Sequence, residues 1–129
     1  MKNLLKSMMA ILIITLSTAC TSVPIYNVTS AKVQNPKSAN DTYTAIMDAG
    51  KKLGWKFTKT KEEGKLKGVI HLRRHVAIIS LNYSASDYSI KYMSSENLKY
   101  DQESQKIHKN YNSWIKNLRN EIDMNLEFN

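Results

Sequence analysis

Few side chains in this 129-residue chain could carry out chemistry, and the only thiol among them is that of Cys20. One cysteine cannot form an internal disulfide, and it excludes the cysteine clusters of zinc ribbons. Three histidines could in principle ligate a metal ion, namely His71, His75 and His108. No carboxylate lies near His71 and His75 in the sequence, and His108 is expected on a distant helix. We therefore expect no metal site and no other cofactor.

The sequence signatures of common enzymes are also missing. The chain has no glycine-rich loop that would hold phosphates and no Gly-x-Ser-x-Gly turn that would present a nucleophilic serine. Its 11 aspartates and glutamates are scattered, whereas acid–base catalysis needs a close, partly buried pair. We therefore expect a protein that is not an enzyme.

The twenty residues that end on Cys20 have the three parts of a secretory signal peptide. Lys2 and Lys6 make a positive start, residues 8–16 are apolar apart from one threonine, and residues 17–19 are small. The apolar run is too short to span a bilayer, which takes about 20 residues. We expect residues 1–19 to be a signal peptide that is removed on export.

The end of this segment resembles the lipobox of bacterial lipoproteins. In that family the peptide is cut just before the cysteine, whose sulfur receives a diacylglycerol and whose new amine is acylated, for example with palmitate. Ser17 departs from the leucine that usually stands three residues before the cysteine. Lipidation also fits two physical arguments, since exported chains seldom keep one unpaired thiol and several acyl chains anchor stably. The alternative is a soluble secreted protein with a free cysteine.

The resemblance implies that Cys20 carries a membrane anchor. In enteric bacteria an aspartate after the cysteine retains a lipoprotein in the inner membrane, and Thr21 occupies that position here. We expect a monomer on the outer membrane that faces the periplasm or the surface. Loss of Lys2 and Lys6 lowers the net charge from +8 to +6. Because an exported lipoprotein does not meet the cell's DNA, we expect anionic lipids and neighbouring proteins as partners, and no nucleic acid.

Arg73, Arg74 and His75 are predicted to lie at the tip of a hairpin with lysines on the flanking strands. Such a basic surface could contact anionic envelope material, such as lipopolysaccharide phosphates, lipid headgroups or acidic polymers. The alternative is an ordinary solvated strand edge that its charges protect from further pairing.

Aromatic side chains are concentrated between residues 83 and 114. One interpretation is a pocket between sheet and helices that holds an acyl chain or a partner's peptide, because a tyrosine combines an apolar ring with a polar tip. The other is a core beneath a helix. The candidate pocket residues are Tyr83, Tyr88, Tyr92, Leu98, Tyr100, Tyr111 and Trp114.

The elements that would position these residues follow from the hydrophobic periodicity. Apolar residues three and four apart predict helices over 41–53, capped by Asn40 or Asp41, and over 104–125. Between them, four alternating segments predict an antiparallel meander. We expect an α+β fold in which a four-stranded antiparallel sheet carries both helices on one face. The other face should be solvated and holds Lys56, Lys67, His71, Arg73, Ser80, Ser89 and Lys91.

The segment after the cysteine lacks a sustained period and is rich in Ser, Thr, Asn and Pro. We predict a lipidated Cys20 and a flexible tether over residues 20–40, in which a short strand could form around 25–28. The globular domain is predicted over residues 41–129, which suffices for one small core without a disulfide.

Several segments of the predicted domain are similar to a family of small proteobacterial lipoproteins of uncharacterised function. They are residues 82–92 (NYSASDYSIKY), 94–98 (SSENL) and 107–115 (IHKNYNSWI). The Lys- and Asn-rich composition most resembles that of virulence-associated lipoproteins of Francisella. The resemblance covers residues 41–122 and implies an outer-membrane lipoprotein with a compact α+β domain. It brings no catalytic residues.

Together these observations predict a non-enzymatic, lipid-anchored cell-envelope protein that binds an envelope partner or a small amphipathic ligand and contributes to virulence. The alternative is a structural accessory subunit of an outer-membrane assembly complex. A groove continuous with the core would favour a ligand, whereas a flat apolar patch on an exposed helix would favour a protein partner.

Overall fold

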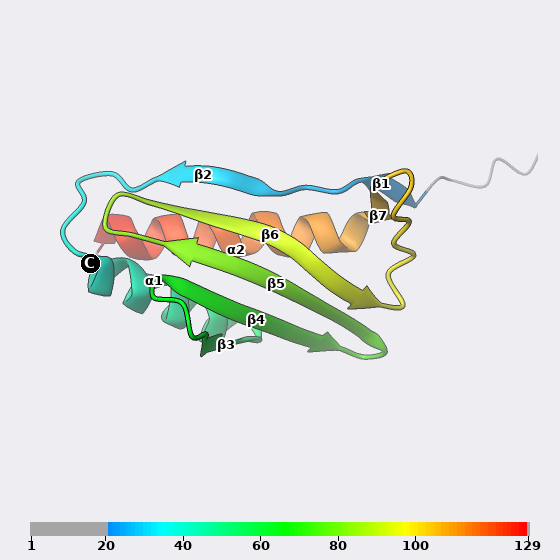
Figure 1. Ribbon diagram of the computed structural model, residues 1–129, viewed down its shortest axis with the longest axis horizontal. Helices are drawn as coiled ribbons and strands as arrows, with labels where there is room; N and C mark the ends of the chain where they lie inside the picture. Colours follow the sequence, from blue (N-terminus) through cyan, green and yellow to red (C-terminus); the bar gives the residue numbers. More distant parts are fainter. Residues whose placement is uncertain (1–20, 129) are drawn as a thin grey trace, which may run out of the picture.

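The computed structural model describes residues 21–128, so the predicted signal peptide and Cys20 lie outside the described residues. A five-stranded antiparallel sheet carries both helices on one face, and a two-stranded ribbon lies at one end (Figure 1). The predicted α+β class is confirmed, but the sheet has five strands and not four. In chain order the elements are β1 (Ser22–Pro24), β2 (Val28–Lys32), α1 (Ala39–Leu53), β3 (Trp55–Lys59), β4 (Lys65–Leu72), β5 (His75–Tyr83), β6 (Asp87–Glu96), β7 (Lys106–His108) and α2 (Lys109–Phe128).

Strands β3 to β6 are the predicted meander, and each pairs with the next through a short connection. Leu72 pairs with His75 across the β4–β5 turn, where Arg73 has a φ of 58°. The order across the sheet is β2-β6-β5-β4-β3, so β2 and β3 are its edges. Alternating side chains of these strands face the helices, as the period of two predicts.

The fifth strand, β2, lies in the segment that we predicted to be a tether. It pairs with β6 through Val28↔Ile90 and Ala31↔Tyr88, with a bulge between the two pairs. Val28 is 3% exposed and Ala31 is 2% exposed, so this segment belongs to the core. The structure therefore replaces much of the predicted tether over residues 20–40 by strands, and the domain begins before residue 41. The bulge separates the two buried residues by three positions, which hides the alternation in the sequence.

The second helix begins at Lys109, five residues after the predicted start at 104, because residues 106–108 form β7. β7 pairs with β1 through Val23↔Ile107. In the first turn of α2, the Asn112 side chain accepts a hydrogen bond from the Tyr26 N–H at 2.9 Å and donates one to the Pro24 carbonyl at 2.8 Å. The start of the described chain is therefore fastened to the start of α2.

Helix α1 is the predicted one, but its cap is Ser38 and not Asn40 or Asp41. The Ser38 Oγ accepts a hydrogen bond from the Asp41 N–H at 3.1 Å. The helix ends at Gly54, whose φ of 89° is readily adopted by a residue without Cβ.

The core fills the space between the helices and one face of the sheet. Its fully buried large side chains are Ile46, Leu66, Ile79, Leu81, Tyr88, Ile90, Leu98, Ile107, Tyr111, Ile115, Leu118 and Ile122. Within residues 21–128 no helix covers the other face of the sheet. The three lysines predicted for that face, Lys56, Lys67 and Lys91, are exposed. Ser89 departs from that prediction, because it is only 9% exposed.

Candidate functional site

The molecule has two ends that bring together different parts of the chain (Figure 1). The β1 end consists of β1, β7, the β4–β5 turn and the loop over residues 97–105. The cleft end, opposite to it, consists of the loop over residues 33–38, the β5–β6 turn and the C-terminal turns of α2. The predicted site residues are divided between these ends and the core.

The seven predicted pocket residues do not come together in one cavity. Leu98, Tyr88 and Tyr111 are fully buried in the core. Tyr83 lies elsewhere, with its ring 5.8 Å from that of Tyr43 in α1. None of the seven lines any of four pockets that residues 21–128 form. Their alternative interpretation, packing beneath a helix, describes their surroundings better.

Three of these tyrosines form a cluster that joins β6, the 97–105 loop and α2. The Tyr92 ring lies 4.3 Å from that of Tyr100 and 5.6 Å, edge to face, from that of Tyr111. Burial raises the pKa of the Tyr111 hydroxyl, because a phenolate would lose its hydration there. Trp114 instead faces His75, at 6.3 Å between ring centroids. The cluster fastens the loop to the core.

The three basic candidates lie at the β1 end. Arg73 and Arg74 are exposed at the β4–β5 turn, and His75 is half-buried beside it. The His75 Nδ1 lies 2.7 Å from the Asn97 carbonyl oxygen, and the Asn97 side chain donates to the Arg74 carbonyl at 2.7 Å. The turn is therefore held against the 97–105 loop, while its guanidinium groups stay in solvent.

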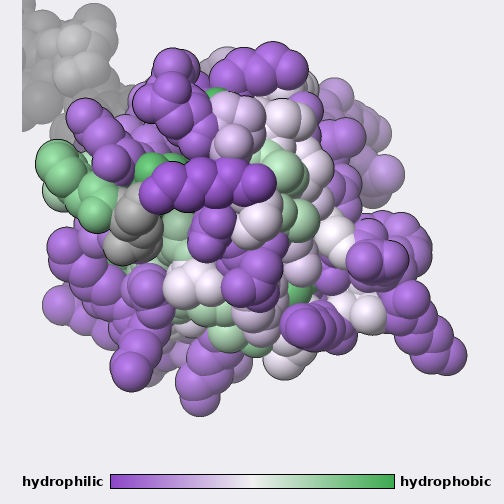
Figure 2. Space-filling model, turned by 90° about the vertical axis from the view of Figure 1, so that its left-hand side faces the viewer, coloured by the Kyte–Doolittle hydropathy of each residue, from purple (hydrophilic) through white to green (hydrophobic). Residues whose placement is uncertain are grey.

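At the cleft end, a pocket of about 590 Å³ separates the edge strand β2 from α2. Both walls carry charge, since Lys32 lies on the β2 wall and Arg119, Asp123 and Glu127 lie on the α2 wall, and Val33 contributes apolar surface. Figure 2 faces this end and shows a mostly hydrophilic surface with small apolar areas between charged side chains. The lining residues are Ser30, Lys32, Val33, Gln34, Asn35, Arg119, Asp123, Leu126 and Glu127.

A polar chain beneath the cleft fixes the α2 wall. The Tyr88 hydroxyl donates to the Asp123 carboxylate at 2.6 Å, and the Arg119 carbonyl oxygen lies 3.3 Å from the same hydroxyl. Burial and the hydrogen bond to Asp123 raise the pKa of Tyr88, so it remains a neutral donor. The Arg119 guanidinium donates to the Tyr26 hydroxyl at 2.9 Å. The charged side chains of this wall are thus held by partners on β6 and on the segment before β2.

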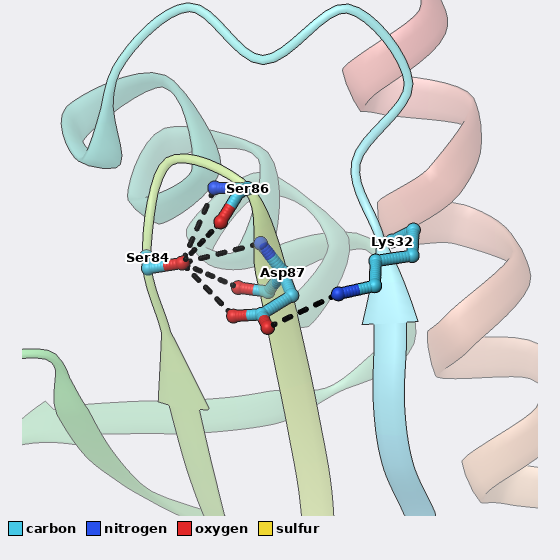
Figure 3. Close-up of polar contacts among 4 residues, drawn as sticks. All are labelled: Lys32, Ser84, Ser86 and Asp87. Carbon is cyan, nitrogen blue, oxygen red and sulfur yellow. Dashed lines mark hydrogen bonds and ion pairs between the residues drawn. The ribbon is translucent and has the colours of Figure 1, made fainter.

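The β2 wall is fixed by the β5–β6 turn (Figure 3). The Ser84 hydroxyl donates to the Asp87 carboxylate at 2.9 Å and accepts from the N–H groups of Ser86 and Asp87. Lys32 reaches the same carboxylate at 3.8 Å. The Val33 N–H donates to the Ser86 carbonyl at 2.9 Å. The end of β2 is therefore tied to a turn that is closed by its own hydrogen bonds.

Sequence reasoning missed the cleft, because its two walls come from residues 30–35 and 119–127. The polar side chains on α2 that line it look like an ordinary solvated helix face. The one available signal was the tyrosine at position 88, whose hydroxyl needs a partner when its ring is buried.

Within residues 21–128 no group of three or more histidine, cysteine, aspartate or glutamate side chains is arranged to hold a metal ion. In the same range neither helix has the length and apolar character to cross a bilayer. Comparison with protein-family models, curated proteins and solved structures found no match to this chain. The resemblance to small proteobacterial lipoproteins therefore stays a prediction.

Proposed function

We propose that this protein is a non-enzymatic, lipid-anchored protein of the outer membrane, whose cleft binds an extended segment of another envelope protein. The observation that carries the proposal is the separation of the two ends. The Lys109 N–H donates to the Thr21 carbonyl at 2.8 Å, which pins the residue after Cys20 to the β1 end. A lipid on Cys20 would hold that end at the membrane, and the cleft would point away from it.

The shape and chemistry of the cleft favour a peptide over a small amphipathic ligand. β2 pairs with β6 on one side only, so its outer edge has backbone groups that an added strand can use. Charges of both signs on the walls suit a polar peptide. The aromatic residues that would hold an acyl chain are instead buried or dispersed.

The experiment places a photo-cross-linking residue at Ser30 of the full-length protein in the native bacterium. A matched control carries it at Thr58, on the opposite edge strand β3. We expect one envelope protein to be cross-linked from Ser30 and not from Thr58. Glu127→Lys reverses a charge in the cleft and should lower the yield about fivefold, whereas Glu63→Lys in the β3–β4 turn should not.

The anchor is tested in the same cells. Cys20→Ala should move the protein from the membrane pellet to the soluble fraction, while Thr21→Ala should leave it in the pellet. Unchanged fractionation of Cys20→Ala would contradict the anchor. Equal cross-linking from both edge strands would contradict the proposal that the cleft is the binding site. A cross-link from Ser30 to lipid would favour a small amphipathic ligand over a peptide.

A further inference from the structure

The described chain starts at a fixed place in the fold. Ser22 pairs with His108, and the Thr21 carbonyl accepts from the Lys109 N–H at 2.8 Å. Consecutive Cα atoms are about 3.8 Å apart. If Cys20 is lipidated, the acyl chains therefore begin within about one residue of the β1 end, and there is no long tether to let the domain turn freely.

The surface around this point is mainly basic. Its exposed basic side chains are Arg73, Arg74, Lys99, Lys106 and Lys109, and its acidic ones are Glu96, Asp101 and Glu103. Asp101 is engaged within its own loop, where it accepts from the Ser104 hydroxyl at 2.7 Å and from the Glu103 N–H at 3.1 Å. The basic side chains come from three separate segments that meet only in the folded domain.

Two further observations describe this surface. Desolvation lowers the pKa of His108, and Coulombic interactions with Lys99, His75 and Lys109 lower it further, so these groups lie near one another at the β1 end. Leu72, next to the arginines, is a large apolar side chain that is 45% exposed. Basic groups that border an apolar side chain suit the boundary between lipid headgroups and acyl chains.

We propose that the β1 end lies against the membrane and binds anionic phospholipid headgroups through Arg73, Arg74, Lys99 and Lys109. This rests on the proposed anchor at Cys20 and specifies the face that the domain turns to the bilayer. Because the lipid fixes the distance and the charges fix the orientation, the cleft end points away from the membrane.

The test uses the full-length mature protein, with its lipid verified by mass spectrometry, in nanodiscs of zwitterionic phosphatidylcholine or of phosphatidylcholine mixed with phosphatidylglycerol. Amide hydrogen exchange is followed over residues 72–75 and 97–105. We expect exchange there to be slower by about tenfold in the anionic discs, and to be equal in the two discs around the cleft.

A charge-matched pair of variants separates a specific contact from general attraction. Arg73→Glu with Arg74→Glu should abolish the protection, whereas Lys56→Glu with Lys67→Glu, on the open sheet face, should preserve it. Loss in both variants, or equal exchange in the two kinds of disc, would overturn the proposal while leaving the anchor intact. A chain without lipid would instead refute the proposed anchor.

Discussion

At the β1 end the first strand is joined to its partner by backbone pairing, whereas at the cleft end the charged walls are positioned mainly by side-chain hydrogen bonds. β1, β7 and the first turn of α2 are joined through main-chain groups and Asn112. The cleft walls depend on Tyr88, Ser84 and their carboxylate partners. Backbone pairing does not depend on the surface side chains, so the basic side chains of the β1 end are free to serve another purpose. Changes to Tyr88 or Ser84 should move the walls of the cleft.

The largest expected effect compares the loss of a buried side chain at the β1 end with the loss of a half-buried side chain at the cleft. Ile107→Ala should lower the free energy of unfolding by about 2–5 kcal/mol, because it leaves a cavity under the β1–β7 ribbon. Leu126→Ala at the cleft, which is only half-buried, should cost about 1 kcal/mol. Urea unfolding measures both, and equal losses would show that the ends do not differ in this way.

The next effect tests whether side chains hold the cleft. Tyr88→Phe removes the donor to Asp123 and should destabilise the fold by about 1–3 kcal/mol. Tyr26→Phe, which removes the acceptor of a more exposed hydrogen bond to Arg119, should cost less. Thermal unfolding measures both variants. A larger loss of stability in Tyr26→Phe than in Tyr88→Phe would contradict this account.

A smaller effect concerns the β5–β6 turn. Ser84→Ala should cost about 0.5–1.5 kcal/mol, because two backbone N–H groups lose their shared acceptor. Ser113→Ala, which removes one long hydrogen bond on an exposed helix face, is the control and should be nearly neutral. Chemical denaturation that ranked Ser113→Ala as the more damaging change would be evidence against a structural role of the turn.

The smallest effect is a pH dependence at the β1 end. The pKa of His108 is lowered in the folded protein, so the unfolded chain binds a proton more readily. The free energy of unfolding therefore contains a contribution from keeping His108 neutral. This contribution is complete above the ordinary pKa of histidine, near 6.5, and declines as the pH falls below that value. Denaturation at pH 5 and pH 8 should therefore differ less in His108→Gln than in the original protein. An identical difference would exclude this contribution.

The sequence predicted those elements whose pattern is local. Strands β3 to β6 show clean alternation, and α1 ends at Leu53, where the helical pattern predicted its end. β2 could not be recognised, because its bulge separates Val28 from Ala31 and its neighbours are polar. β7 was assigned to the helix, because Ile107 fits the helical stripe as well as it fits a strand.

The site was less predictable than the fold for a physical reason. The tyrosines were correctly seen as a concentration of aromatic residues, but the sequence could not show that Tyr88 and Tyr111 point into the core and Tyr83 toward α1. The cleft joins residues about 90 positions apart, such as Ser30 and Arg119. Only the pairing of β2 with β6 and the packing of α2 bring them together.

The pairing of β1 with the start of α2 also affects the order in which the chain can fold. Tyr26 and Asn112 are 86 residues apart. In the export that we propose, the β1 end would therefore close only after nearly the whole chain has left the translocation channel. Until then β1 would lack its partner strand β7. That interval would keep the cysteine accessible to the membrane enzymes that modify and cut lipoproteins, before the folded domain covers the residues beside it.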